Sequence, residues 1–160
     1  MSQVILGVDP GSRDTGFGVV REEGEQILHL ASGRIHTGRA PSLEDRLRQI
    51  YDGLTALIKE HQPQALALEE IFLAANVRSA FILGQVQGVV ILAAAQSSLP
   101  VSQYAATTVK KAVVGYGQAT KSQVQLMIEQ LLGLKVTNEH AADALAVGVC
   151  HLFHSRWPQG

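Results

Sequence analysis

The chain has 160 residues, of which 46% are hydrophobic and 17% charged, and its formal net charge is −1. This composition excludes an intrinsically disordered chain, and the single cysteine, Cys150, excludes an internal disulfide framework or a thiolate-rich zinc site. Because no apolar run reaches the ~20 residues that span a bilayer and no signal-peptide pattern opens the chain, we expect a cytoplasmic protein with no membrane partner.

Three strands are predicted at the start of the chain. Residues 4–8 form an apolar run that ends at an Asp-Pro-Gly-Ser turn, a pattern typical of a buried strand. Residues 15–20 and 26–36 are two further strand candidates, and the polar stretch 22–25 predicts the turn between them. Together these segments predict an antiparallel meander.

A helix and a fourth strand come next. Ser42 is a candidate N-cap with Asp45 three residues later, and apolar residues then recur at helical spacing until Pro63. Residues 65–68 predict a fourth buried strand that ends at Glu69.

The second half of the chain predicts mostly helices. In order, the patterns indicate a long apolar helix over 76–97, a short strand over 100–104 and helices over 107–114, 120–132 and 139–153. Three early strands followed by alternating helices and strands predict an α/β fold with a mixed sheet.

No linker or repeat divides the chain. We therefore expect one domain over residues 1–155 and a C-terminal tail over 156–160.

Charge is distributed unevenly along the sequence. Residues 1–70 carry 7 basic and 11 acidic side chains, whereas residues 71–160 carry 6 basic and 3 acidic ones. This asymmetry allows a positive surface beside an acidic pocket, and chance clustering is the alternative explanation.

Three carboxylates and one histidine are the candidate functional groups. Asp9 and Glu69 each end an apolar strand, and a buried carboxylate needs a cation or hydrogen-bond donors. His140 and Asp143 share one face of the last predicted helix, among small apolar residues. Turn capping, pairing with arginine and a helix-dipole contact are the alternatives. If the four groups converge, their ligand chemistry suits Mg²⁺ or Mn²⁺.

The motifs around these residues form an ordered series that resembles the RuvC family of Holliday-junction resolvases, within the RNase H-like superfamily. The resemblance covers residues 4–154. It rests on these segments: Gly7-Val8-Asp9-Pro10-Gly11-Ser12, Leu68-Glu69-Glu70-Ile71-Phe72, Gly84-Gln85-Val86-Gln87-Gly88, Tyr104-Ala105-Ala106, Val109-Lys110, Val113-Val114-Gly115, Lys121-Ser122-Gln123-Val124 and Ala142-Asp143-Ala144-Leu145-Ala146.

The resemblance implies a fold, a reaction and a set of catalytic residues. The fold is a five-stranded mixed RNase H-like sheet, three antiparallel strands and then parallel ones, flanked by helices. The activity is a crossover junction endodeoxyribonuclease of recombination and repair, which makes paired symmetric nicks with 5′-phosphate ends. Asp9, Glu69 and Asp143 match the family's metal-binding carboxylates, and Lys121 matches a lysine near the scissile phosphate. Two ions are implied. His140 stands where many members have aspartate, so we expect Mn²⁺ to support activity better than Mg²⁺.

Further residues and partners follow from the same resemblance. Lys110 and Lys121 match lysines that the family uses on DNA, and Phe72 matches a base-stacking aromatic, although a core phenylalanine is an equal alternative. Lys111 and Arg78 are weaker candidates for DNA contact. The implied partners are four-way junction DNA, a second copy of the chain that packs through the helix containing residues 84–88, and the RuvA–RuvB branch-migration complex.

Two other functions compete with the endonuclease. An Asp-x-Gly turn also binds phosphate in actin-like ATPases and sugar kinases, but those proteins need a second, similar domain. A non-catalytic junction-binding module is the other alternative, if His140 disrupts metal binding.

Overall fold

The computed structural model describes residues 2–71 and 76–156. Five strands and five helices are found there. In chain order they are β1 (Ser2–Asp9), β2 (Asp14–Glu23), β3 (Gln26–His36), α1 (Leu43–His61), β4 (Ala65–Glu69), α2 (Val77–Gln96), β5 (Val101–Tyr104), α3 (Ala106–Val114), α4 (Lys121–Leu132) and α5 (Glu139–Arg156).

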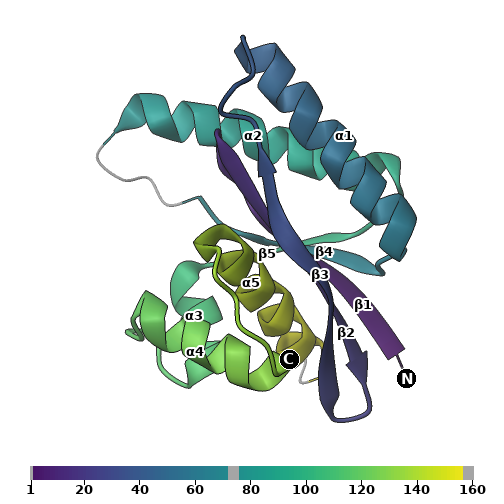
Figure 1. The fold of residues 1–160 in the computed structure, drawn as a ribbon, viewed down its shortest axis with the longest axis vertical. Coiled ribbons are helices and arrows are strands. Elements are labelled where there is room, and N and C mark those ends of the chain that lie inside the picture. Colours follow the sequence, from purple (N-terminus) through teal and green to yellow (C-terminus); the bar gives the residue numbers. More distant parts are fainter. Residues whose placement is uncertain (1, 72–75, 157–160) are drawn as a thin grey trace.

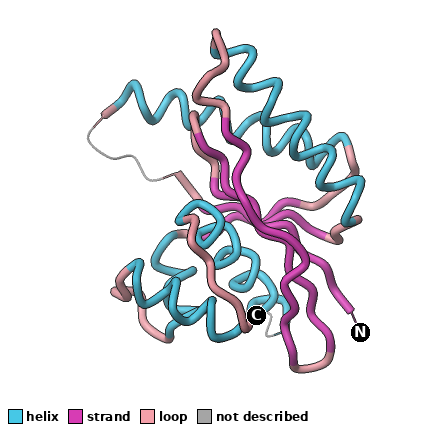
Figure 2. Tube along the Cα trace, in the orientation of Figure 1, coloured by secondary structure: helices cyan, strands magenta, loops and turns pink. Residues whose placement is uncertain are grey.

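The five strands form one mixed sheet in the order β3-β2-β1-β4-β5. β1, β2 and β3 pair antiparallel, whereas β4 and β5 run parallel to β1. The expected five-stranded α/β fold is therefore confirmed. Figure 1 shows α1 and α2 on one face of the sheet and α3, α4 and α5 on the other, and Figure 2 shows the strands crossing between these two helical layers.

Side chains of β1 alternate between the two cores because successive residues of a strand point to opposite faces. Ile5 packs into the core beneath α5, whereas Leu6 and Val8 pack into the core beneath α1 and α2. All three are fully buried. The short apolar run at the start of the chain thus anchors both layers.

Helix α5 lies directly against the backbone of the sheet. A Cβ atom on Gly7 of β1 would lie 2.0 Å from the carbonyl oxygen of Ala144, and one on Gly16 of β2 would lie 2.0 Å from that of His140. Only glycine permits this close approach. The two glycines therefore bring the first turns of α5 beside the end of β1.

Most predicted elements agree with the structure to within one or two residues at their ends. Ser42 caps α1 by accepting a hydrogen bond from the Asp45 amide at 3.2 Å. β2 is longer than expected at both ends, and α5 continues to Arg156, whose guanidinium pairs with Glu22. Arg156, expected in the tail, is therefore part of α5, and residues 157–160 lie outside the described part of the chain.

Helix α2 is more apolar over its full length than we expected. Among the helices of the described residues, it alone is long and apolar enough to cross a membrane by length and composition, with a mean hydropathy of 1.6 over an 18-residue window. Val86, Val90, Ala93 and Ala94 pack this helix into the core. Core helices of globular proteins have similar lengths and compositions, so these two properties do not show that α2 crosses a membrane.

Candidate active site

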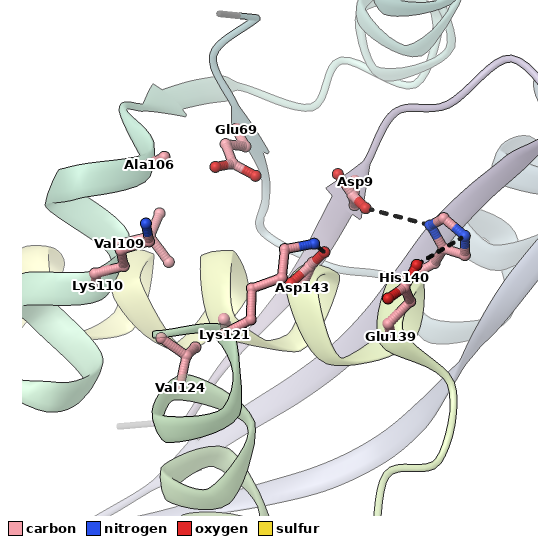
Figure 3. A pocket seen from close by; sticks show the side chains of 11 residues that line it. Asp9, Glu69, Ala106, Val109, Lys110, Lys121, Val124, Glu139, His140 and Asp143 are labelled. Atoms are coloured by element: carbon pink, nitrogen blue, oxygen red, sulfur yellow. Dashed lines mark hydrogen bonds and ion pairs between the residues drawn. The ribbon is translucent and has the colours of Figure 1, made fainter. Parts of the chain in front are cut away.

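A cavity of about 340 Å³ opens where the ends of β1 and β4 meet α3, α4 and α5 (Figure 3). Its charged and polar lining consists of Asp9, Glu69, Lys110, Lys121, Glu139, His140 and Asp143. The structure thus brings Asp9, Glu69, His140 and Asp143 to one place, together with two of the predicted lysines.

Strand register explains why Asp9 and Glu69 are neighbours. β1 and β4 are parallel, with Val8 opposite Leu68, so the next residue of each strand leaves the sheet at the same edge. Because the buried strands anchor the backbone up to these positions, the two carboxylates have fixed attachment points. In Figure 3 they flank the same space above α5.

Helix α5 supplies the other two predicted groups. Asn138 caps the helix by accepting a hydrogen bond from the Ala141 amide at 3.0 Å, which fixes where the helix begins. His140 and Asp143, three residues apart, then lie on the face turned toward the cavity. Because Gly16 has no side chain, the His140 carbonyl lies close against β2, and this fixes how near the start of α5 lies to the sheet.

The carboxylates in the cavity repel one another. Burial, followed by the charges of Asp143 and Glu69, raises the pKa of Asp9 from 3.8 to about 7. Burial and then the charge of Asp143 also raise the pKa of Glu69. Desolvation and like charges both disfavour the ionised form of an acid, so this arrangement favours a bound proton or a cation among the carboxylates.

Lys110 and Lys121 line the cavity beside the carboxylates, and Lys121 contacts one of them directly. The Nζ atom of Lys121 lies 3.3 Å from Oδ2 of Asp143, and this charge raises the pKa of Lys121. Lys121 is the first residue of α4, which is held by a capping box between Thr120 and Gln123. The Lys121 side chain remains 74% exposed, so it is accessible to a second anion such as a phosphate.

His140 lies between two carboxylates. Its Nδ1 atom is 3.7 Å from Oδ2 of Asp9, and its Nε2 atom is 3.9 Å from Oδ2 of Asp14. Glu139, which is 71% exposed, approaches Nε2 at 4.0 Å. These are ion-pair separations, longer than hydrogen bonds.

Three of the predicted DNA-contacting residues do not line the cavity. Lys111 lies on α3 next to Lys110 but is not in the lining, and Arg78 is exposed in the first turn of α2. Phe72 lies outside the described residues. The roles of these three residues therefore stay predictions.

Sequence reasoning missed two acidic residues of the site. Glu139 is one helical turn before Asp143, and that spacing could have revealed it. Asp14 follows the Asp-Pro-Gly-Ser turn, and only the pairing of β2 with β3 shows what surrounds it.

The side chains present fit a hard divalent cation. Oxygen ligands with an occasional imidazole suit Mg²⁺ and Mn²⁺, and the mutual repulsion of Asp9, Glu69 and Asp143 favours positive charge between them. In residues 2–71 and 76–156, no group of three or more acidic, histidine or cysteine side chains is arranged to hold a metal ion by itself. Mg²⁺ is usually bound through one or two carboxylates together with water and substrate phosphate, so it does not require such a group.

Comparison with known families gives the chain its classification. The family model described as crossover junction endodeoxyribonuclease RuvC matches residues 5–151. The chain belongs to the RuvC family. The RuvC of Geobacter sulfurreducens is 49% identical over 148 residues, covering 92% of this chain and 90% of that protein. The RuvC of Shewanella sp. strain W3-18-1 is 50% identical over 154 residues, which cover 96% of this chain and 88% of that protein.

Solved RuvC structures agree with this classification. Thermus thermophilus RuvC matches with a TM-score of 0.89 at 33% identity, covering 96% of this chain and 95% of that one. The same protein in complex with a Holliday junction substrate matches with a TM-score of 0.92. The yeast mitochondrial Holliday junction resolvase matches at 0.63 with 8% identity, which shows the fold alone. Membership in the RuvC family replaces the actin-like or sugar-kinase alternative.

Proposed function

We propose that the chain cuts four-way DNA junctions as a divalent-metal-dependent endonuclease, making paired symmetric nicks that leave 5′ phosphates. The observation that carries this proposal is the convergence of Asp9, Glu69 and Asp143 in one cavity, with Lys121 beside them, in a member of the RuvC family. The match to a RuvC bound to a Holliday junction supports the choice of substrate.

Asp9, Glu69 and Asp143 are the proposed ligands of two Mg²⁺ or Mn²⁺ ions, with His140 as a further ligand or as the acceptor of a proton from the attacking water. Ions held there would supply an activated water and neutralise charge on the leaving oxygen. The exposed ammonium of Lys121 is placed to hold a phosphate oxygen beside Asp143. Lys110 adds positive charge at the side of the cavity next to Glu69.

The histidine in the site is the basis of the proposed metal preference. A neutral imidazole is a softer ligand than a carboxylate and brings no negative charge, so Mn²⁺ should support cleavage better than Mg²⁺. We expect His140→Asp to lower the ratio of Mn²⁺-supported to Mg²⁺-supported cleavage by roughly tenfold, or about 1.4 kcal/mol. Initial rates of both proteins in each metal measure this ratio. An unchanged ratio would count against His140 as a ligand.

DNA contacts are proposed to extend beyond the cavity. Lys111 and Arg78 are exposed on α3 and α2, where they can neutralise phosphates without touching the reacting atoms. Phe72 remains the candidate for stacking on a base at the junction. Replacing Lys111 or Arg78 with glutamine should weaken junction binding and reduce the salt dependence of binding. The rate at which the bound junction is cleaved should not change.

Helix α2 is the proposed homodimer interface. Val77, Phe81 and Leu92 are 68%, 72% and 50% exposed, and they share a helical face with Gly84 and Gly88, which have open space above them. An exposed apolar stripe of this kind is typical of a protein–protein contact, and a two-fold dimer matches a junction with two equivalent strands to cut. Phe81→Glu should shift the chain from dimer to monomer in sedimentation velocity.

The remaining family expectations are location and assembly. We place the chain in the cytoplasm, where it would act on DNA, and we expect it to cooperate with a RuvA–RuvB complex. Co-migration with RuvA on junction DNA in a native gel would test that partnership.

Cleavage of a synthetic four-way junction in Mn²⁺ tests the proposed function. We expect symmetric nicks on two opposing strands, ends that DNA ligase can reseal, and little cleavage of a linear duplex of the same sequence. A protein that binds the junction but leaves it intact in either metal would support the non-catalytic binding module instead.

A further inference from the structure

A second cavity adjoins the candidate active site at His140. Its volume is about 340 Å³, and it lies between the turn that joins β1 to β2 and the first turns of α2. The charged and hydroxyl-bearing side chains of its lining are Ser12, Arg13, Asp14, Ser79 and His140. Because His140 also lines the cavity of the carboxylates, the two cavities meet at this side chain.

The second cavity carries a positive charge that no acid balances. Among the described residues, Asp14 is the one carboxylate in its lining, and Oδ1 of Asp14 accepts a hydrogen bond from Nη1 of Arg34 at 3.0 Å. These two opposite charges offset each other. In residues 2–71 and 76–156, no carboxylate lies within ion-pair distance of the exposed Arg13 side chain. The charge of this cavity therefore favours an anion.

Two buried threonines hold the backbone of the turn that carries Arg13. The Thr37 amide donates to the carbonyl of Arg13 at 2.7 Å, and the Thr37 hydroxyl donates to the carbonyl of Ser12 at 2.8 Å. The Thr15 hydroxyl donates to the carbonyl of Gly11 at 2.8 Å. All three bonds end on backbone atoms of the turn, so a change in the Arg13 side chain leaves them in place.

Positive side chains lie on both sides of the carboxylates. Lys110 and Lys121 come from α3 and α4, whereas the cavity of Arg13 is walled by α2, in the helical layer on the other face of the sheet (Figure 1). A third cavity of about 220 Å³ shares Asp9 with the first and Leu83 with the second. Since every nucleotide of a DNA strand carries a negative charge, a strand that crosses the carboxylates presents phosphates to both layers.

We propose that the second cavity binds a phosphate adjoining the one that is cut, and that Arg13 holds this phosphate. This inference rests on the proposed function, because it extends the path of the cleaved strand. A guanidinium suits the role, since its planar donors match two oxygens of a phosphate. Arg13 does not line the cavity of the carboxylates, so it contributes to binding and placing the strand.

Junction binding without divalent ions tests the role of Arg13. In EDTA, fluorescence anisotropy of a labelled four-way junction over a series of NaCl concentrations gives the affinity and its salt dependence. We expect Arg13→Gln to bind roughly five- to tenfold more weakly, as the loss of a charge-assisted contact predicts. The slope of log K against log salt should fall by about 0.9 for each Arg13 side chain that contacts duplex DNA.

Two variants control for charge and for folding. Lys59→Gln also removes one exposed positive charge, but Lys59 lies near the end of α1, beside the start of β4 and away from the Glu69 end of that strand. We expect it to match the wild type in affinity and slope. Arg13→Lys keeps the charge, so it should keep the slope and bind within about threefold of wild type. Equal losses in Arg13→Gln and Lys59→Gln would overturn the Arg13 site.

Neutral linkages in the DNA show which phosphate Arg13 holds. Junctions with a single methylphosphonate are compared, one for each phosphate within three of the branch point. At one position beside the scissile phosphate, we expect the neutral linkage to weaken binding by wild type about as much as Arg13→Gln does, and to have no further effect on Arg13→Gln. Equal losses in both proteins at every position would contradict the contact.

Failure of this proposal is distinguishable from failure of the proposed function. A wild-type protein that binds junctions but cuts none would contradict the nuclease, and the two binding experiments would still decide whether Arg13 holds a phosphate. A wild-type protein that cuts junctions, with an Arg13→Gln variant of unchanged affinity and slope, would overturn the Arg13 site alone.

Discussion

Replacing Asp9 with asparagine should abolish cleavage while leaving junction binding intact. The Asp9 side chain is 21% exposed, and it lines the same cavity as Glu69, Asp143 and His140. An amide of the same shape cannot supply the negative charge that holds a divalent ion. Since such an ion contributes several kcal/mol to the reaction, we expect the rate of junction cleavage to fall at least about 10³-fold.

The neighbouring acid Glu70 provides the matched control for this experiment. Glu70 comes directly after Glu69 but is exposed and does not line the main cavity, so Glu70→Gln should cleave within a few-fold of wild type. Gel-shift measurements without divalent ions should give all three proteins similar affinities, because phosphate contacts dominate binding. An Asp9→Asn variant that retains more than a tenth of the wild-type rate would contradict the assignment of Asp9 to the metal site.

The metal-free protein should become less stable as the pH rises from about 4 to 7. The pKa of Asp9 is about 7 in the folded state against 3.8 for the free side chain, so the folded protein keeps a proton that the unfolded chain has lost. The free energy of unfolding falls wherever the folded state binds more protons, and over this range the loss is about 4 kcal/mol at most. The raised pKa of Glu69 acts in the same direction.

Asp9→Asn should remove most of this pH dependence. At pH 8 in EDTA, where wild-type Asp9 is ionised and unpaired, we expect the variant to melt roughly 5 °C higher. At pH 4, close to the pKa of 3.8 of the free side chain, Asp9 is protonated in the folded state and only about half ionised in the unfolded chain, so the two proteins should melt within about two degrees of each other. Millimolar Mn²⁺ should raise the melting temperature of the wild type more than that of the variant, because the ion binds the folded state. Equal melting curves at pH 8 would show that Asp9 is not under electrostatic strain.

The sequence predicted the strands and carboxylates well because their signals are local. Asp9 and Glu69 were recognisable as acids at the ends of apolar strands, and Ser42 and Thr120 were recognisable as helix caps. The ends of β2 were missed because residues 21–23 carry charged side chains, and only hydrogen bonding to both neighbouring strands continues the strand there.

Convergence of the site depends on features that no local pattern contains. Asp9 meets Glu69 through the parallel register of β1 and β4, and it meets α5 because Gly7 and Gly16 admit the helix against the sheet. The surroundings of Asp14 depend on the register of β2 with β3, where a shift of one residue would point its side chain to the other face. The sequence therefore identified Asp9, Glu69 and Asp143 but not Glu139 or Asp14, and long-range pairing determines which acids lie together.

Anomalous scattering from a crystal soaked in Mn²⁺ tests the central claim most directly. We predict density for at least one ion between Asp9, Glu69 and Asp143, within about 2.3 Å of a carboxylate oxygen of Asp9. Ions found only at other surfaces, with these three side chains bare at saturating Mn²⁺, would contradict the metal-dependent mechanism.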